Sequence, residues 1–140
     1  MHRIPHHDGP CKAFHGHRYV AEITCSGEVG ETGMIIDFAR IKESVGSWIN
    51  SNWDHTGILW SEDKDPAAIA VRKLNDGLGR PVYLLNNPPT AENIAAELAR
   101  TSSSLLHPHG IQVASVKVWE TPNSYATWLS PSLTVRARIQ

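Results

Sequence analysis

The strongest constraint on the fold of this chain is a set of half-buried strands near its two ends. Apolar and polar residues alternate with a period of two over residues 19–25, 111–120 and 124–129, and a short apolar run covers residues 34–36. Because successive side chains of a strand point to opposite faces, this period predicts strands with one buried face. Between the two pairs of strands the apolar spacing becomes helical. The order predicts an α+β domain with helices on one face of an antiparallel sheet.

Three residues mark the starts of the expected helices. Asp37, Asp65 and Thr90 each precede a segment with helical spacing. Each of these side chains can accept a hydrogen bond from the first turn of a helix, which is the role of an N-cap residue. Helices are therefore expected from residue 38 to about 50, from 66 to about 76 and from 91 onwards, with a short strand over 82–85.

Composition limits the class of protein. A length of 140 residues fits one domain over residues 1–140. Lys and Arg total 13 against 14 Asp and Glu, so bulk charge gives no argument for a nucleic-acid partner. No apolar run approaches the roughly 18 residues of a membrane span, and the N-terminus lacks the apolar region of a signal peptide. Two cysteines are too few for a disulfide framework, so a cytoplasmic location is expected.

Histidines are concentrated at the start of the chain. Five of the eight lie within the first 17 residues, namely His2, His6, His7, His15 and His17. His15 and His17 stand two apart at the start of a strand, so both imidazoles face one side. Such a pair suits zinc, with the third ligand drawn from the other three histidines. A surface pair without a metal is the ordinary alternative.

Cys11 lies four residues before His15 and has two possible tasks. As a fourth protein ligand it would close the site into a structural zinc centre. Beside an open metal position its thiol would instead serve as a base or a nucleophile. The spacing alone leaves both tasks open.

Several motifs, in order along the chain, resemble those of the 6-pyruvoyltetrahydropterin synthase superfamily. They are His-Arg-Ile-Pro-His at 2–6, Cys-Lys-Ala-Phe-His-Gly-His-Arg-Tyr at 11–19, Gly-Met-Ile-Ile-Asp-Phe at 33–38 followed by Lys42, Asp-His at 54–55, Pro-Thr-Ala-Glu-Asn at 89–93 and Val-Trp-Glu-Thr at 118–121. Three residues separate Cys11 from His15. That gap is similar to the carboxy-type branch of the family and shorter than the gap of the pyruvoyl-type branch.

This resemblance implies a tunnelling fold (T-fold), in which a four-stranded antiparallel sheet carries helices on one face. Three subunits form a barrel, commonly within a homohexamer, and the active sites lie between subunits. Compared with the family pattern, the first strand is expected to be truncated, because only Met1 precedes His2. Residues 60–87 are expected to form a longer helical insertion, and residues 130–140 an extra tail.

The resemblance also implies a reaction. Carboxy-type members convert 7,8-dihydroneopterin triphosphate to 6-carboxy-5,6,7,8-tetrahydropterin, with loss of acetaldehyde and triphosphate, in the biosynthesis of queuosine and other 7-deazaguanines. The expected protein is therefore a zinc-dependent lyase with a small-molecule substrate, without a nucleic-acid or membrane partner.

Roles for the reacting residues follow from the matched motifs. The resemblance implies that zinc is held by His2, His15 and His17. Cys11 would act as the base, and Asp54 would orient His55 for proton transfer.

Substrate contacts follow in the same way. Glu120 would anchor the pterin, because a carboxylate can accept two hydrogen bonds from its planar edge. Thr90 would contact the pterin through its backbone, or serve only as a helix N-cap. Arg3 and Lys12 would meet the triphosphate, or remain ordinary solvated charges.

Three alternatives stay open. A pyruvoyl-type synthase would eliminate triphosphate and keep the substrate side chain. A non-catalytic pterin-binding protein would use Glu120 beside an incomplete metal site. A structural zinc site would be closed by Cys11 together with three histidines.

Overall fold

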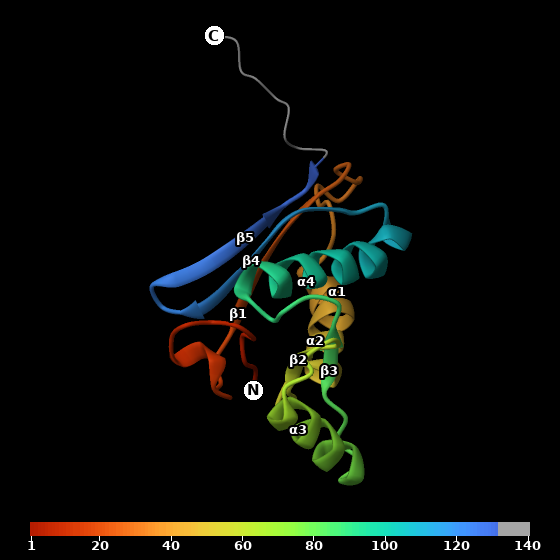
Figure 1. Ribbon diagram of the computed structural model, residues 1–140. Coiled ribbons are helices and arrows are strands. Elements are labelled where there is room, and N and C mark those ends of the chain that lie inside the picture. Colours follow the sequence, from red (N-terminus) through yellow and green to blue (C-terminus); the bar gives the residue numbers. More distant parts are fainter. Residues whose placement is uncertain (132–140) are drawn as a thin grey trace.

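The computed structural model describes residues 1–131, and an antiparallel sheet with helices on one face forms its main body (Figure 1). The sheet has the strand order β1-β4-β5. Its strands are β1 (Val20–Ser26), β4 (Gln112–Thr121) and β5 (Ser124–Leu129). They lie where the alternating segments predict them, so the α+β class is confirmed.

Antiparallel pairing brings distant parts of the chain together. β1 pairs with β4 so that Val20 lies opposite Trp119, and β4 pairs with β5 through a tight turn. Glu120 therefore lies at the end of β4 that adjoins the start of β1. This register places Glu120 near the residues that precede β1, which include His15 and His17.

Residues 34–36 do not form the predicted strand, so the main sheet of residues 1–131 has three strands instead of four. The Gly30 N–H donates to the Met34 carbonyl, and Gly33 takes a positive φ of 76°. The segment thus closes hydrogen bonds within its own turn and does not pair with the edge of β1. Met34 and Ile35 are left exposed.

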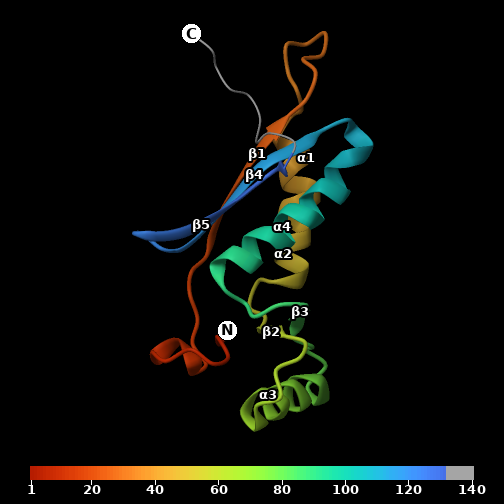
Figure 2. The same ribbon diagram turned by 45° about the horizontal axis from the view of Figure 1, so that its top comes forward.

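Two helical segments cover the same face of the sheet (Figure 2). α4 (Ala91–Leu106) packs on β4 and β5. The second segment is continuous and consists of α1 (Phe38–Ile41), the π-helical turn η2 (Lys42–Gly46) and α2 (Ser47–Asn52). The hydrophobic core includes Val45, Ile94, Leu98, Leu106, Val116 and Val118. Within residues 1–131, no helix has both the length and the apolar character needed to cross a membrane.

The three predicted helix starts are confirmed. The side chains of Asp37, Asp65 and Thr90 each accept a hydrogen bond from a backbone N–H of the following first turn, at 2.8, 2.9 and 3.4 Å. These bonds satisfy donors that a helix N-terminus otherwise leaves unpaired.

A smaller unit lies at the end of the molecule away from the main sheet (Figure 1). In it, β2 (Ile58–Trp60) and β3 (Tyr83–Leu85) pair in parallel and are connected by α3 (Pro66–Gly77). The predicted helix and the short predicted strand of this region are confirmed. β2 is not predictable by period, because three residues are too few to display one. The predicted extra tail lies outside the described residues from position 132 onwards.

Candidate metal centre and active site

Three histidines converge in front of β1. Ring nitrogens of His2, His15 and His17 all lie within 4.8 Å of one another. The ring centroid of His2 is 4.4 Å from that of His15 and 5.2 Å from that of His17. Three imidazoles in this arrangement form a set of nitrogen ligands suited to zinc. We call these three residues the histidine triad.

His2 is held firmly although it lies next to the first residue. Its N–H donates to the His15 carbonyl at 2.8 Å, and the His15 N–H donates back at 3.0 Å. On the other side, the Met1 carbonyl accepts from the Ile58 N–H at 2.8 Å. A short extended segment is thus held between the residues before β1 and the start of β2. His2 is only 1% exposed.

Hydrogen bonds define the tautomers of two triad members. Nδ1 of His2 donates to the Pro89 carbonyl at 2.9 Å, and Nδ1 of His15 donates to the Ala13 carbonyl at 2.9 Å. A neutral imidazole that donates through Nδ1 carries a lone pair on Nε2. Burial lowers the pKa of His2, which favours this neutral form.

A buried nitrogen without a partner indicates what the triad can hold. Nε2 of His15 is buried and has no hydrogen-bond partner among the described residues. Such an atom costs free energy unless something satisfies it. A zinc ion is a group that a lone pair on Nε2 satisfies, so the residues present fit this metal.

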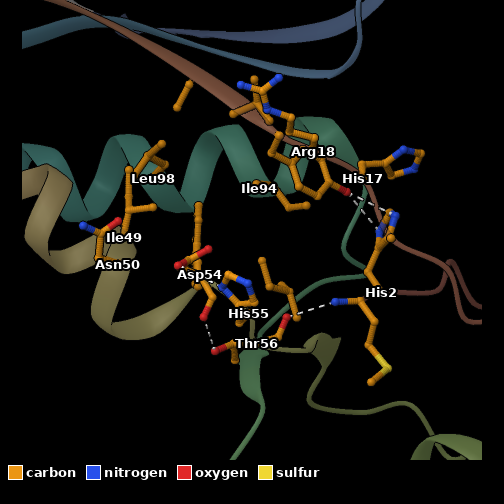
Figure 3. Close-up of a pocket in the computed structure, with 17 residues that line it drawn as sticks. His2, His17, Arg18, Ile49, Asn50, Asp54, His55, Thr56, Ile94 and Leu98 are labelled. Atoms are coloured by element: carbon orange, nitrogen blue, oxygen red, sulfur yellow. Dashed lines mark hydrogen bonds and ion pairs between the residues drawn. The ribbon is translucent and has the colours of Figure 1, made fainter.

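Two members of the triad, His2 and His17, border a cavity of about 600 Å³ (Figure 3). His2 and His17 line it together with Asp54 and His55, which follow α2. Most of the remaining lining is apolar and includes Ile49, Ile58, Ile94, Leu98 and Val118. We call this space the site cavity. A largely apolar cavity with a few polar groups is typical of a small-molecule site.

Asp54 and His55 form a pair at the rim of the site cavity. Nδ1 of His55 lies 3.0 Å from Oδ2 of Asp54. Both side chains are exposed, at 58% and 92%. His55 has a positive φ of 55°, which is uncommon for residues other than glycine and turns the chain sharply after α2. The pair can therefore present an oriented imidazole to a ligand.

Tyr19 links the triad to Glu120, and no site role was predicted for it. Its hydroxyl donates to Oε1 of Glu120 at 3.3 Å and lies 3.1 Å from Nε2 of His2. Burial, together with the negative charge of Glu120, raises the pKa of Tyr19 well above its usual range, so the hydroxyl keeps its proton. Tyr19 has the same strand parity as His15 and His17, and this signal in the sequence could have identified it.

Cys11 lies close to this group but outside the triad. It belongs to the short 3-10 helix η1 (Pro10–Lys12), and its thiol is free and half-buried. Its carbonyl accepts from the Ile4 N–H at 2.8 Å, which places Cys11 beside the segment that carries His2. No thiol joins the ligand group within residues 1–131, so the structure does not favour a closed four-ligand zinc site.

Other predicted residues have local partners. The Thr90 hydroxyl caps α4 by accepting from the Asn93 N–H, while the Thr90 N–H donates to the Pro88 carbonyl and the Thr90 carbonyl accepts from the Ile94 N–H. His6 and His7 are exposed and lie outside the triad. Nδ1 of His7 accepts from the Gly9 N–H. The third member of the triad is therefore His2, which the spacing alone did not decide.

Comparisons with known proteins bear on the family and the fold of the chain. The family model described as 6-pyruvoyl tetrahydropterin synthase matches residues 1–130. A 6-carboxy-5,6,7,8-tetrahydropterin synthase of Rickettsia bellii is 40% identical over 126 residues, which are 89% of this chain and 88% of that protein. An uncharacterized protein of Wolinella succinogenes superposes with a TM-score of 0.73 at 22% identity, over 85% of this chain and 80% of that chain. The Caenorhabditis elegans 6-pyruvoyl tetrahydropterin synthase superposes with a TM-score of 0.60 at 26% identity, over 87% and 74%.

Proposed function

Since the chain belongs to the 6-pyruvoyl tetrahydropterin synthase family, and has its T-fold, we propose that it is a carboxy-type synthase. The proposed reaction converts 7,8-dihydroneopterin triphosphate and one water to 6-carboxy-5,6,7,8-tetrahydropterin, acetaldehyde and triphosphate. The relative in Rickettsia bellii carries the name of this activity. The proposal includes zinc dependence, a cytoplasmic location and a place in queuosine or other 7-deazaguanine biosynthesis.

One observation carries the proposal: two members of the histidine triad, His2 and His17, line the same site cavity as the Asp54–His55 pair. A metal site alone would also suit a structural ion. A polar pair across a cavity of this size adds a group that can move a proton next to a bound small molecule. When bound to the triad, zinc would act as a Lewis acid toward oxygens of the substrate side chain.

Cys11 is proposed as the base. A thiol must ionise to take a proton in this role, and a half-buried free thiol is accessible to a substrate while being shielded from bulk solvent. It must also stay reduced, which agrees with the proposed cytoplasmic location.

The second proton-handling group is the imidazole of His55. Asp54 accepts from Nδ1 of His55, so Nε2 is the atom that gives or takes a proton. The hydrogen bond of 3.0 Å holds the imidazole in this orientation.

Glu120 is proposed to orient the pterin. Its carboxylate already accepts one hydrogen bond from Tyr19 and has further lone pairs for the amino and N–H edge of the ring. Tyr19 thereby sets the position of the ring relative to the triad.

The proposed assembly is a homotrimer or homohexamer with active sites between subunits. In the described chain, β1 and β5 are the edge strands of the main sheet. Val20, Tyr125 and Leu129 on these strands are about half exposed or more. Exposed strand edges with apolar side chains favour pairing with further copies. The open rim at His55 leaves room for a neighbouring subunit to complete the site.

Product analysis tests the proposal. The zinc-loaded protein is incubated with 7,8-dihydroneopterin triphosphate under anaerobic conditions, and products are read by mass spectrometry. 6-Carboxytetrahydropterin with an equal amount of acetaldehyde is the expected result. 6-Pyruvoyltetrahydropterin without acetaldehyde would establish the pyruvoyl-type reaction instead, and bound but unchanged substrate would establish a binding protein.

A further inference from the structure

Arg3 is a buried cation whose side chain contacts two separate segments of the chain. It directly follows His2 and is 8% exposed. Its Nε donates to the Lys12 carbonyl at 3.0 Å. Its Nη1 lies 2.8 Å from Oδ2 of Asp65 and 3.3 Å from Oδ2 of Asp63. A buried guanidinium is tolerated because these acceptors replace the water it has lost.

These contacts exclude both sequence-based interpretations of Arg3. It is not a solvated charge, because it is buried. It is also not a free cation for triphosphate, because two carboxylates already neutralise it. The guanidinium fork instead joins the segment of His2 to other parts of the molecule.

The first of these parts is the segment that carries Cys11. Lys12, whose carbonyl accepts from Arg3, directly follows Cys11. The Cys11 carbonyl itself accepts from the Ile4 N–H at 2.8 Å. Two neighbouring carbonyls of η1 are therefore bound by two neighbouring residues of the His2 segment. The guanidinium also lies 5.9 Å from the ring centre of Phe14, which precedes His15.

The second part is the loop between β2 and α3. Asp63 is 5% exposed at its side chain and also accepts from the Asp65 N–H at 3.0 Å. Asp65 in turn caps α3 through the Ala67 N–H. This N-cap bond and the nearby Arg3 lower the pKa of Asp65, so its carboxylate stays charged. Hydrogen bonds within the loop thus hold both carboxylates in position to accept from Arg3.

We propose that Arg3 is a positioning residue that sets the placement of Cys11 relative to the metal-binding His2, with Asp63 as its anchor. The role rests on the proposed function, in which Cys11 is the base and His2 a zinc ligand. It requires an arginine, since Nε and Nη1 lie in one rigid plane, where Nε reaches the Lys12 carbonyl and Nη1 reaches the carboxylates of Asp63 and Asp65. A lysine supplies the charge without the fork. The proposal also assigns a task to the loop that precedes α3.

The test compares Arg3→Lys with the wild-type protein. Arg80→Lys is the matched control, because Arg80 is an exposed arginine in the loop after α3. Four quantities are measured on the zinc-loaded protein: kcat, KM, zinc per chain, and the iodoacetamide alkylation rate of Cys11. The alkylation rate of Cys25, the other free thiol, is the internal reference.

In Arg3→Lys, zinc content stays at the wild-type level and KM changes by less than about twofold, while kcat falls about tenfold because the base is displaced. Cys11 alkylation rises about threefold relative to Cys25, because the loosened segment exposes its thiol more often. Asp63→Asn produces the same pattern to a smaller extent, and it carries the comparison if Arg3→Lys does not fold.

Unchanged kcat together with an unchanged Cys11-to-Cys25 alkylation ratio would overturn the positioning role. So would a loss of kcat that added zinc restores in full, because Arg3 would then act on the metal site alone. If the wild-type protein does not turn over the substrate, the proposed function fails, and the alkylation ratio still decides the role of Arg3.

Discussion

The hydroxyl of Tyr19 lies 3.1 Å from Nε2 of His2. This is the ring nitrogen that remains free for a metal, because Nδ1 of His2 donates to the Pro89 carbonyl. The same hydroxyl donates to Glu120 at 3.3 Å. One side chain thus connects the metal-binding group with the proposed pterin anchor, which approach each other from opposite ends of the chain.

Tyr19→Phe removes this connection and leaves the ring in place. We expect unchanged zinc content, because the triad keeps its three nitrogens. The loss of one hydrogen bond to a carboxylate costs about 1 kcal/mol, which is roughly a fivefold loss in kcat/KM, mainly through KM. Steady-state kinetics with the metal-loaded variant measure it. An unchanged KM would show that Tyr19 does not orient Glu120 for the substrate.

His15→Ala removes the buried nitrogen that has no partner in residues 1–131. Three nitrogen ligands are needed for tight zinc binding, so zinc measured by mass spectrometry is expected to fall from about one to below about 0.1 per chain. The control is His7→Ala, since His7 is exposed and outside the triad. Equal zinc loss in both variants would point to a metal site elsewhere.

Asp54→Asn keeps the shape of the pair but removes its negative charge. Because Asp54 orients His55 in the proposed reaction, kcat is expected to fall by about two orders of magnitude with zinc content unchanged. Asp76→Asn, at an exposed position in α3, serves as the control. A kcat close to that of the control would remove the pair from the mechanism.

The lowered pKa of His2 makes the stability of the metal-free protein depend on pH. Burial holds the folded-state pKa below the ordinary value of 6.5, so the unfolded chain binds the proton more readily. The contribution of neutral His2 is therefore fully present above pH 6.5 and is lost as the pH falls below it. Urea unfolding at several pH values measures this loss. In His2→Gln the slope just below this pH should be shallower, and an identical slope would contradict the assignment.

Local sequence signals predicted most helices and strands, whereas the composition of the candidate site depended on tertiary contacts. The caps at Asp37, Asp65 and Thr90 predicted three helix starts, because a cap and its helix are neighbours in sequence. The spacing of two residues predicted that His15 and His17 lie together, although both precede β1, which begins at Val20 instead of at His15.

The third member of the triad could not be predicted from local sequence, because it is determined by a contact between two segments that are not neighbours in the chain. His2, His6 and His7 are alike in spacing, and only the backbone bridge from His2 to His15 distinguishes them. The burial of Arg3 likewise depends on Asp63, 60 positions away, which no local pattern indicates. The strand predicted over residues 34–36 does not form, because the Met34 carbonyl accepts from the Gly30 N–H within the same turn.

The most direct test of the account is acetaldehyde release as a function of bound zinc. Zinc is removed from the wild-type protein by chelation and added back in steps, and acetaldehyde from 7,8-dihydroneopterin triphosphate is measured at each step. The account predicts no release without metal and a rise in proportion to zinc that levels off at about one ion per chain. Release that is independent of zinc, or no acetaldehyde at full loading, would contradict it.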